Sequence, residues 1–161
     1  TDPKVHILLF ERIIGCPATC PFCAAPCDAH TMNKSGKHST TLHRPEGIHG
    51  MRDHNTKILT ADICSTLTSP NSTWRFYNSD TDNEWVDYKN YSKIYPYWEI
   101  PHEANPNHVK YWKYVFSKYQ NELANYHGAK ENTSREVKAW GRYDENTIKA
   151  DLAECYQMTV N

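Results

Sequence analysis

The sequence predicts a small α+β domain with a zinc-stabilised N-terminal loop region rich in Cys and His, and with helices toward its C-terminal end. The chain has 161 residues, a length typical of one domain, and we expect that domain to span residues 1–161. Four cysteines and five histidines lie within residues 15–55, where apolar periodicity is weak. Over residues 105–158 apolar residues recur at helical spacing, so this part is expected to be mainly helical.

The composition explains why such a domain needs a metal or disulfides. Aromatic residues supply much of the apolar mass, with eleven Tyr, five Trp and four Phe, and the mean hydropathy is −0.81. Buried Tyr and Trp side chains must also find hydrogen-bond partners for their hydroxyl and indole N–H groups. A small core that is poor in aliphatic side chains commonly depends on a bound metal or on disulfides.

Charge and hydropathy argue against two classes of protein. The net charge is −1 and the chain has no basic block, so tight binding to duplex nucleic acid through phosphate neutralisation is not expected. No run approaches eighteen apolar residues, so no membrane span is expected either.

The expected elements of the first hundred residues are short. Residues 4–14 resemble a buried strand that ends at Gly15. The pattern predicts a short helix over residues 56–68 and a strand over residues 74–78. Residues 88–101 alternate aromatic and charged side chains, and their two prolines forbid a long helix, so we expect an extended aromatic clamp over the core.

Two helices are expected in the C-terminal part. The first spans about residues 107–127, because Pro106 suits a first helical position and Gly128 is suited to ending a helix. The second begins after Asp144, whose carboxylate is a good N-terminal cap.

A Cys/His motif carries the strongest chemical signal. Cys20 and Cys23 are separated by two residues, fourteen residues follow, and His38 and His43 are separated by four. Two thiolates and two imidazoles at this spacing are typical of a tetrahedral zinc site. The sequence therefore predicts Cys20, Cys23, His38 and His43 as metal ligands and zinc as the cofactor.

Other cysteines and histidines leave alternatives open. Cys16, Cys27 or His30 can replace one of the four ligands, because they lie within the same segment. The six cysteines are an even number, so a disulfide framework with fifteen possible pairings competes with zinc if the protein is secreted. Cys64 and Cys155 each lie on an apolar helical face, where a buried thiol is the simplest interpretation.

A catalytic metal is the less favoured interpretation. A closed four-ligand site is structural by default, whereas catalysis needs an open position and a nearby carboxylate, for which Glu46 and Asp28 are the candidates. His49 and His54 offer a further alternative, a metal-dependent nuclease or hydrolase in which a histidine activates water. We assign no catalytic residue.

Some features favour secretion and glycan binding. The chain begins at Thr1, and four Asn-x-Ser/Thr sites, a pattern that permits N-glycosylation, occur at Asn33, Asn71, Asn90 and Asn132. The aromatic residues of segment 85–98, Trp98 among them, are suited to stacking on sugars. A secreted defence protein or toxin of lectin-like character is therefore an alternative.

Beyond these patterns, nearly the whole chain resembles the C-terminal region of the interferon-induced very large GTPases. The most specific part is Gly15-Cys16-x3-Cys20-Pro-Phe-Cys23-x-Ala-Pro-Cys27 followed by His38-Ser-Thr-x-Leu-His43-Arg-Pro-x-Gly47-Ile-x-Gly50. The resemblance continues, in order, through Cys64-Ser65, then Tyr88 to Ile100, then Tyr111-Trp-Lys-Tyr-Val-Phe116.

The resemblance implies a defence-related accessory module that does not bind GTP, because nothing here matches the GTPase domain of those proteins. It implies the same four metal positions and a cytoplasmic location, whereas Thr1 and the glycosylation motifs point to secretion. We therefore expect a zinc-binding structural or interaction module whose partner, a protein or a glycan, is not identified by the sequence.

Overall fold

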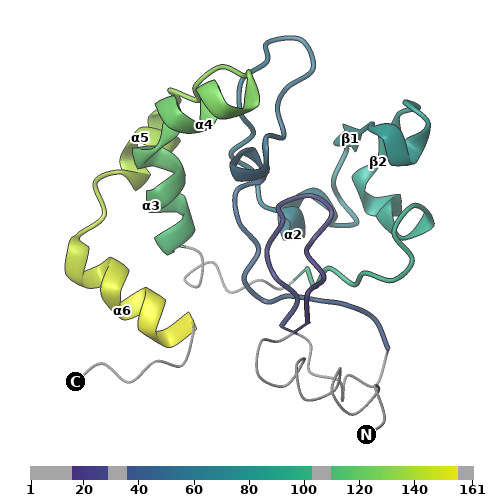
Figure 1. Cartoon of the computed structure of the whole chain (residues 1–161), viewed down its shortest axis with the longest axis horizontal. Helices are drawn as coiled ribbons and strands as arrows, with labels where there is room; N and C mark the ends of the chain where they lie inside the picture. Colours follow the sequence, from purple (N-terminus) through teal and green to yellow (C-terminus); the bar gives the residue numbers. More distant parts are fainter. Residues whose placement is uncertain (1–15, 29–35, 103–109, 156–161) are drawn as a thin grey trace, which may run out of the picture.

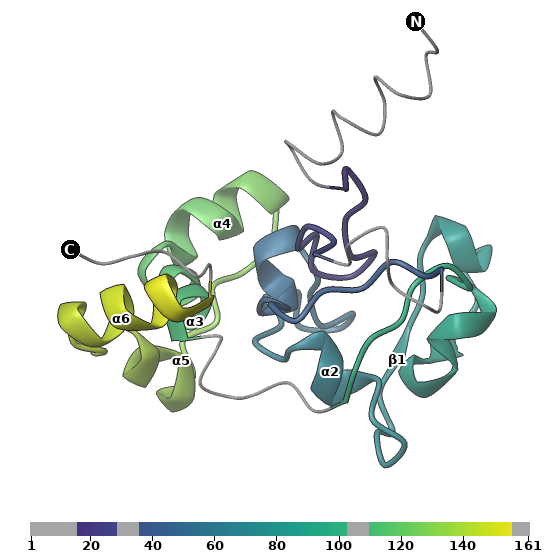
Figure 2. The same cartoon turned by 90° about the horizontal axis from the view of Figure 1, so that it is seen from below.

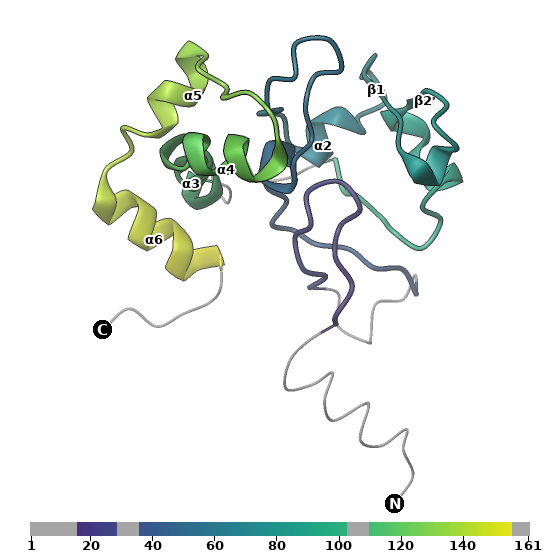
Figure 3. The same cartoon turned by 45° about the horizontal axis from the view of Figure 1, so that its top comes forward.

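The computed structural model describes residues 16–28, 36–102 and 110–155, and these form two halves of different character (Figure 1). The expected strand at 4–14 lies outside the described residues. In all three views the helices α3 to α6 gather on one side, β1 lies on the other, and α2 lies between them (Figures 1–3). This arrangement agrees with the predicted α+β class.

The first half, which contains the cysteine-rich segment, has little regular structure. Its helices are the 3₁₀ helices η1 (Glu46–His49), η2 (Ser79–Thr81) and η3 (Tyr88–Lys93) and the α-helix α2 (Cys64–Leu67). Its two strands, β1 (Arg75–Phe76) and β2 (Val86–Asp87), form an antiparallel pair with Phe76 opposite Val86.

The second half consists of four helices. They are α3 (Lys110–Lys118), α4 (Gln120–His127), α5 (Arg135–Trp140) and α6 (Glu145–Cys155). α3 packs against both α5 and α6. None of the helices within the described ranges is long and apolar enough to cross a membrane.

Each half has its own hydrophobic cluster. In the first, the fully buried Phe22 ring contacts the rings of Phe76 and Tyr88, with centroids 4.9 and 5.0 Å away, and buried cysteines surround these aromatics. In the second, the fully buried Phe116 packs with Trp140, with Ala124 and Val137 from the neighbouring helices, and with Leu59 from the chain before α2. Aromatic rings therefore fill both cores, as the composition predicts.

The segment around η1 joins the two halves. The Arg44 guanidinium lies 3.9 Å from the centre of the Trp112 ring on α3. Gly47 packs so closely on Phe116 that an added Cβ would lie 2.6 Å from a ring carbon, which explains a glycine there. His127 Nε2 lies 3.0 Å from the Ile48 carbonyl oxygen.

The prediction of a helix at 56–68 is wrong except for its last turn, where α2 lies. Arg52 pairs with Leu59, Ile58 with Lys130 and Pro45 with Ile63, so the chain between the turn at 54–56 and α2 is paired with distant backbone rather than helical. The Leu59 N–H donates to the Lys130 carbonyl at 3.0 Å, and its side chain enters the second cluster. Pairing with distant backbone therefore overrides the local helical pattern.

The prediction for residues 88–101 is correct in that their aromatic side chains pack on the core, and wrong in that the backbone is not extended. Tyr88, Trp98 and Ile100 are buried in the first cluster. The backbone is not extended, because η3 occupies the first part of the segment and ends before Pro96. Tyr97 points outward and is 74% exposed.

The single helix expected at 107–127 is two helices, α3 and α4, separated at Tyr119. The Gln120 side chain donates to the Phe116 carbonyl at 2.8 Å, the acceptor that the Gln120 backbone N–H would use in a continuous helix. α4 ends as predicted at Gly128, which has the left-handed φ of 62° typical of a helix end. The sequence patterns do not predict the short helix α5, which Ser134 caps by accepting from the Val137 N–H.

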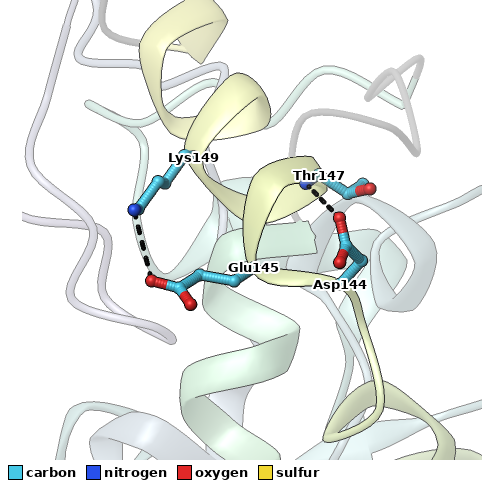
Figure 4. Close-up of polar contacts among 4 residues, drawn as sticks. All are labelled: Asp144, Glu145, Thr147 and Lys149. Atoms are coloured by element: carbon cyan, nitrogen blue, oxygen red, sulfur yellow. Dashed lines mark hydrogen bonds and ion pairs between the residues drawn. The ribbon is translucent and has the colours of Figure 1, made fainter.

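The start of α6 agrees with the prediction. The Asp144 carboxylate accepts a hydrogen bond from the Thr147 N–H at 3.2 Å, which caps the helix (Figure 4). Lys149 pairs with Glu145 one turn earlier at 3.2 Å. Both partners of this ion pair are exposed, so it adds little to stability.

Candidate metal centre

A short hairpin positions the first four cysteines. Thr19 and Pro26 pair across it, and the Ala24 N–H donates to the Cys20 carbonyl at 2.9 Å, which closes a tight turn between Cys20 and Cys23. Ala24 has a left-handed φ of 59°, a conformation that reverses the chain directly after the second thiol. Cys20 and Cys23 therefore lie at the closed end of the hairpin, and Cys16 and Cys27 flank it toward the open end.

A second pairing brings His43 beside α2. Pro45 pairs with Ile63, the residue before Cys64, and the Glu46 N–H donates to the Asp62 carbonyl at 3.0 Å. Cys64 is the first residue of α2, so its thiol lies at the start of a helix that packs on the hairpin. Three segments that are distant in sequence thus converge.

Their convergence forms a group that we call the inner cluster, made of Cys20, Cys23, His43 and Cys64. Their ligand atoms all lie within 4.8 Å of one another, and all four residues are buried. The Sγ atoms of Cys20 and Cys64 are 3.8 Å apart, and Cys23 Sγ is 3.5 Å from His43 Nδ1. Usual zinc bond lengths give tetrahedron edges of about 3.8 Å between sulfurs and about 3.6 Å between sulfur and nitrogen. Both distances are close to these edges, so the inner cluster can hold a metal ion.

The three thiols of the inner cluster differ in acidity. Hydrogen bonds from Cys20 and Cys64 hold the pKa of the Cys23 thiol far below its ordinary value. The hydrogen bond between Cys20 and Cys23 raises the pKa of the Cys20 thiol to about 12. Burial raises the pKa of the Cys64 thiol well above the ordinary range. These directions favour protons on Cys20 and Cys64 when no metal is bound, and thiols must lose their protons to become metal ligands.

Glu46, one of the two carboxylates considered for catalysis, is part of the packing beside this cluster. It is wholly buried, its Oε2 accepts from the Tyr88 hydroxyl at 2.8 Å, and burial raises its pKa to about 8. Asp28, the other candidate, accepts from the Thr41 N–H and hydroxyl. Both carboxylates make structural hydrogen bonds.

The structure brings together three of the four predicted metal ligands, Cys20, Cys23 and His43. His38 lies elsewhere, with Cys16 and Cys27, in a group that we call the outer cluster. Cys64 takes the fourth position of the inner cluster, although it lies outside the motif formed by Cys20, Cys23, His38 and His43. The only sequence signal for it was its place in the string shared with the very large GTPases.

The comparisons with known proteins agree with the family resemblance that this string carries. The family model described as "Interferon-induced very large GTPase 1, C-terminal domain" matches residues 16–152, which include every residue of both clusters. The chain belongs to this family. No solved structure matches this member of the very large GTPase C-terminal family.

Two curated relatives of the family member also match. The chain is 25% identical to interferon-induced very large GTPase 1 of Mus musculus over 128 residues, which cover 80% of this chain and 5% of that protein. It is 25% identical to the Homo sapiens protein of the same name over 153 residues, which cover 92% of this chain and 6% of that protein. The chain spans about a twentieth of these relatives.

The histidines considered for hydrolysis lie outside both clusters. His49 and His54 are exposed. The His54 Nδ1 atom lies 2.7 Å from the Tyr77 hydroxyl, and the His54 ring contacts the rings of Tyr77 and Trp85. These contacts form an aromatic corner rather than a metal site.

This corner borders a cavity of about 630 Å³. The cavity lies against β1, the loop at 50–62 and the start of α5, and its lining includes Trp74, Arg75 and Trp85. Trp74 and Trp85 are 59% and 47% exposed, and the Arg75 guanidinium lies 5.5 Å from the centre of the Trp85 ring. Trp98, named with the sugar-stacking residues, is instead buried in the core.

Proposed function

We propose that this domain is a zinc-stabilised structural and interaction module of the very large GTPase C-terminal family, with no GTPase activity of its own. In this proposal zinc is held by Cys20, Cys23, His43 and Cys64. The observation that carries it is the buried group of three sulfurs and one nitrogen at tetrahedral spacing. A buried site with four protein ligands has no open position for substrate, so its role is structural.

The position of the inner cluster supports a folding role. Its ligands come from the hairpin, from the segment before η1 and from α2. None of these three segments belongs to a long helix or to an extended sheet. Zinc crosslinks these three segments and so supplies stability that short strands and few aliphatic side chains do not. Because the site does not exist in the unfolded chain, the free energy of metal binding becomes folding free energy.

A reducing compartment suits this proposal. No disulfide joins the described cysteines, and thiolate ligands persist where thiols stay reduced. The asparagine of one glycosylation motif also makes a hydrogen bond within the fold, since the Asn132 side-chain amide donates to the Leu59 carbonyl at 2.9 Å. We infer an intracellular, defence-related role, in keeping with relatives named as interferon-induced.

The test is the metal and thiol content of the whole chain purified under reducing conditions. We expect bound zinc by elemental mass spectrometry and six thiols that react after denaturation, the number of cysteines in the sequence. Cys64→Ser should lose the inner zinc and lower the melting temperature strongly, whereas Thr66→Ala, an exposed neighbour on α2, should retain both. A metal-free protein with oxidised cysteines would overturn the proposal.

A second candidate function is glycan binding at the cavity beside β1. The exposed indoles of Trp74 and Trp85 and the adjacent Arg75 support it, because sugar rings stack on aromatic faces and their hydroxyls accept from guanidinium groups. A glycan array should then give specific signals that Trp85→Ala abolishes. The matched control is Tyr97→Ala, which removes an exposed aromatic ring outside the cavity lining and should leave the signals unchanged.

A further inference from the structure

The outer cluster has the donor set of a second metal site. Cys16 Sγ lies 3.4 Å from His38 Nδ1, and the ligand atoms of Cys16, Cys27 and His38 all lie within 4.8 Å of one another. The sulfur–nitrogen distance is close to the edge of about 3.6 Å that zinc bond lengths give. Two thiolates and one imidazole are also a ligand set that suits zinc.

Backbone pairing holds two of these donors, Cys27 and His38, in place without help from a metal. The Cys27 N–H donates to the Ala18 carbonyl at 2.9 Å, which fixes the hairpin near its open end. His38 is held on both sides, because its N–H donates to the Tyr97 carbonyl and its carbonyl accepts from the Glu99 N–H, each at 2.8 Å. A preorganised donor set binds metal with less loss of conformational entropy.

A further pairing joins the hairpin to the segment of His38. The Asp28 N–H donates to the Ser39 carbonyl at 2.9 Å, and the Thr41 hydroxyl donates to the Asp28 carboxylate at 2.8 Å. The His38 ring also packs on the Trp98 ring, with centroids 5.6 Å apart. The imidazole is therefore oriented toward the two thiols by contacts that do not involve the inner cluster.

The two clusters differ in burial and in ligand number. All four inner residues are buried, whereas Cys16 and His38 are only half-buried. The described residues supply three donors to the outer cluster and four to the inner cluster. An ion there is closer to solvent than an ion in the inner cluster.

We propose that Cys16, Cys27 and His38 bind a second zinc ion, which exchanges with solution faster than the ion of the inner cluster. The ligands of the two ions are interleaved along the chain, since Cys16 and Cys27 flank Cys20 and Cys23, and His38 precedes His43. The outer ion fastens the open end of the hairpin to the segment before η1. It depends on no ligand of the inner cluster, so either site can fail alone.

The experiment compares zinc content and release in the full chain and its variants. We expect about two zinc ions per wild-type chain. A colorimetric chelator should remove them in two phases, a fast one from the outer cluster and a slow one that accompanies unfolding. His38→Ala and Cys16→Ser should each remove the fast phase and about half of the zinc, with a small change in melting temperature. His49→Ala, an exposed histidine outside both clusters, should leave both phases intact.

Cobalt substitution gives an independent measure of the ligands. Thiolate-to-cobalt charge-transfer absorption grows with the number of thiolates, and the inner and outer clusters contain three and two. In His38→Ala the outer cobalt ion and its two thiolate bonds should be lost, which should lower this absorption by about two fifths. A wild-type chain that binds only one zinc would overturn the proposal. So would two ions and both release phases retained in both His38→Ala and Cys16→Ser.

Discussion

The two halves of the molecule each bury one phenylalanine completely, but they hold it by different means. Phe22 lies among aromatic rings and cysteines, on segments whose strands are only two residues long. Phe116 lies on α3, among helices that have their own hydrogen bonds and caps. The helical half is built by ordinary helix packing. The loops of the first half surround the buried cysteines of the inner cluster, so a metal ion bound there would supply the stability that regular secondary structure supplies in the second half.

The largest expected effect comes from removing metal, because it acts directly on this difference. Structural zinc contributes about 10–16 kcal/mol in small zinc domains, comparable with the whole stability of a typical domain. We expect a strong chelator to abolish the near-ultraviolet dichroism of the rings around Phe22 and to reduce the far-ultraviolet helical signal of α3 to α6 much less. Equal loss of both signals would contradict the separation of the halves, and no loss would contradict the structural role of zinc.

A matched pair of core substitutions sharpens the comparison. Phe22→Ala and Phe116→Ala each remove a fully buried ring, at a cost of about 3–5 kcal/mol. Phe22 lies between Cys20 and Cys23, so its loss should also weaken zinc binding, whereas Phe116→Ala should lower the melting temperature with zinc affinity unchanged. Competition with a chromophoric chelator measures the affinity, and equal losses of affinity in the two variants would refute the distinction.

The pH dependence of zinc binding tests the electrostatics of the inner cluster. The raised pKa values of Cys20, about 12, and of Cys64 mean that both thiols are protonated at neutral pH without metal. Zinc must displace both protons, so affinity should rise with pH, by about 100-fold or about 2.7 kcal/mol per pH unit. Isothermal titration in buffers of different ionisation enthalpy counts the released protons. Affinity that does not change with pH would contradict the assignment.

The smallest expected effects lie in the helical half, where local signals dominate. Asp144→Ala removes the cap of α6 and should cost about 1 kcal/mol in the free energy of unfolding. Lys149→Ala removes only an exposed ion pair on the same helix and should change stability by less than about 0.5 kcal/mol. Urea unfolding of the zinc-loaded chain compares them, and neither should alter zinc content.

The sequence by itself determined the features that depend on neighbours along the chain. The turn between Cys20 and Cys23, the end of α4 at Gly128 and the start of α6 at Asp144 each follow from residues a few positions apart. Local backbone preference and capping act over this range, so one sequence suffices to predict them. The α+β class and the family follow from longer patterns of the same kind.

Only the tertiary structure decided how the cysteines and histidines are shared between two clusters. His38 and His43 share a motif in sequence, yet pairing with Tyr97 and Glu99 holds His38 at the open end of the hairpin, and pairing of Pro45 with Ile63 brings His43 to Cys64. The non-helical chain before α2 likewise depends on Lys130. These contacts join residues about 20 to 70 positions apart, and no local preference encodes them.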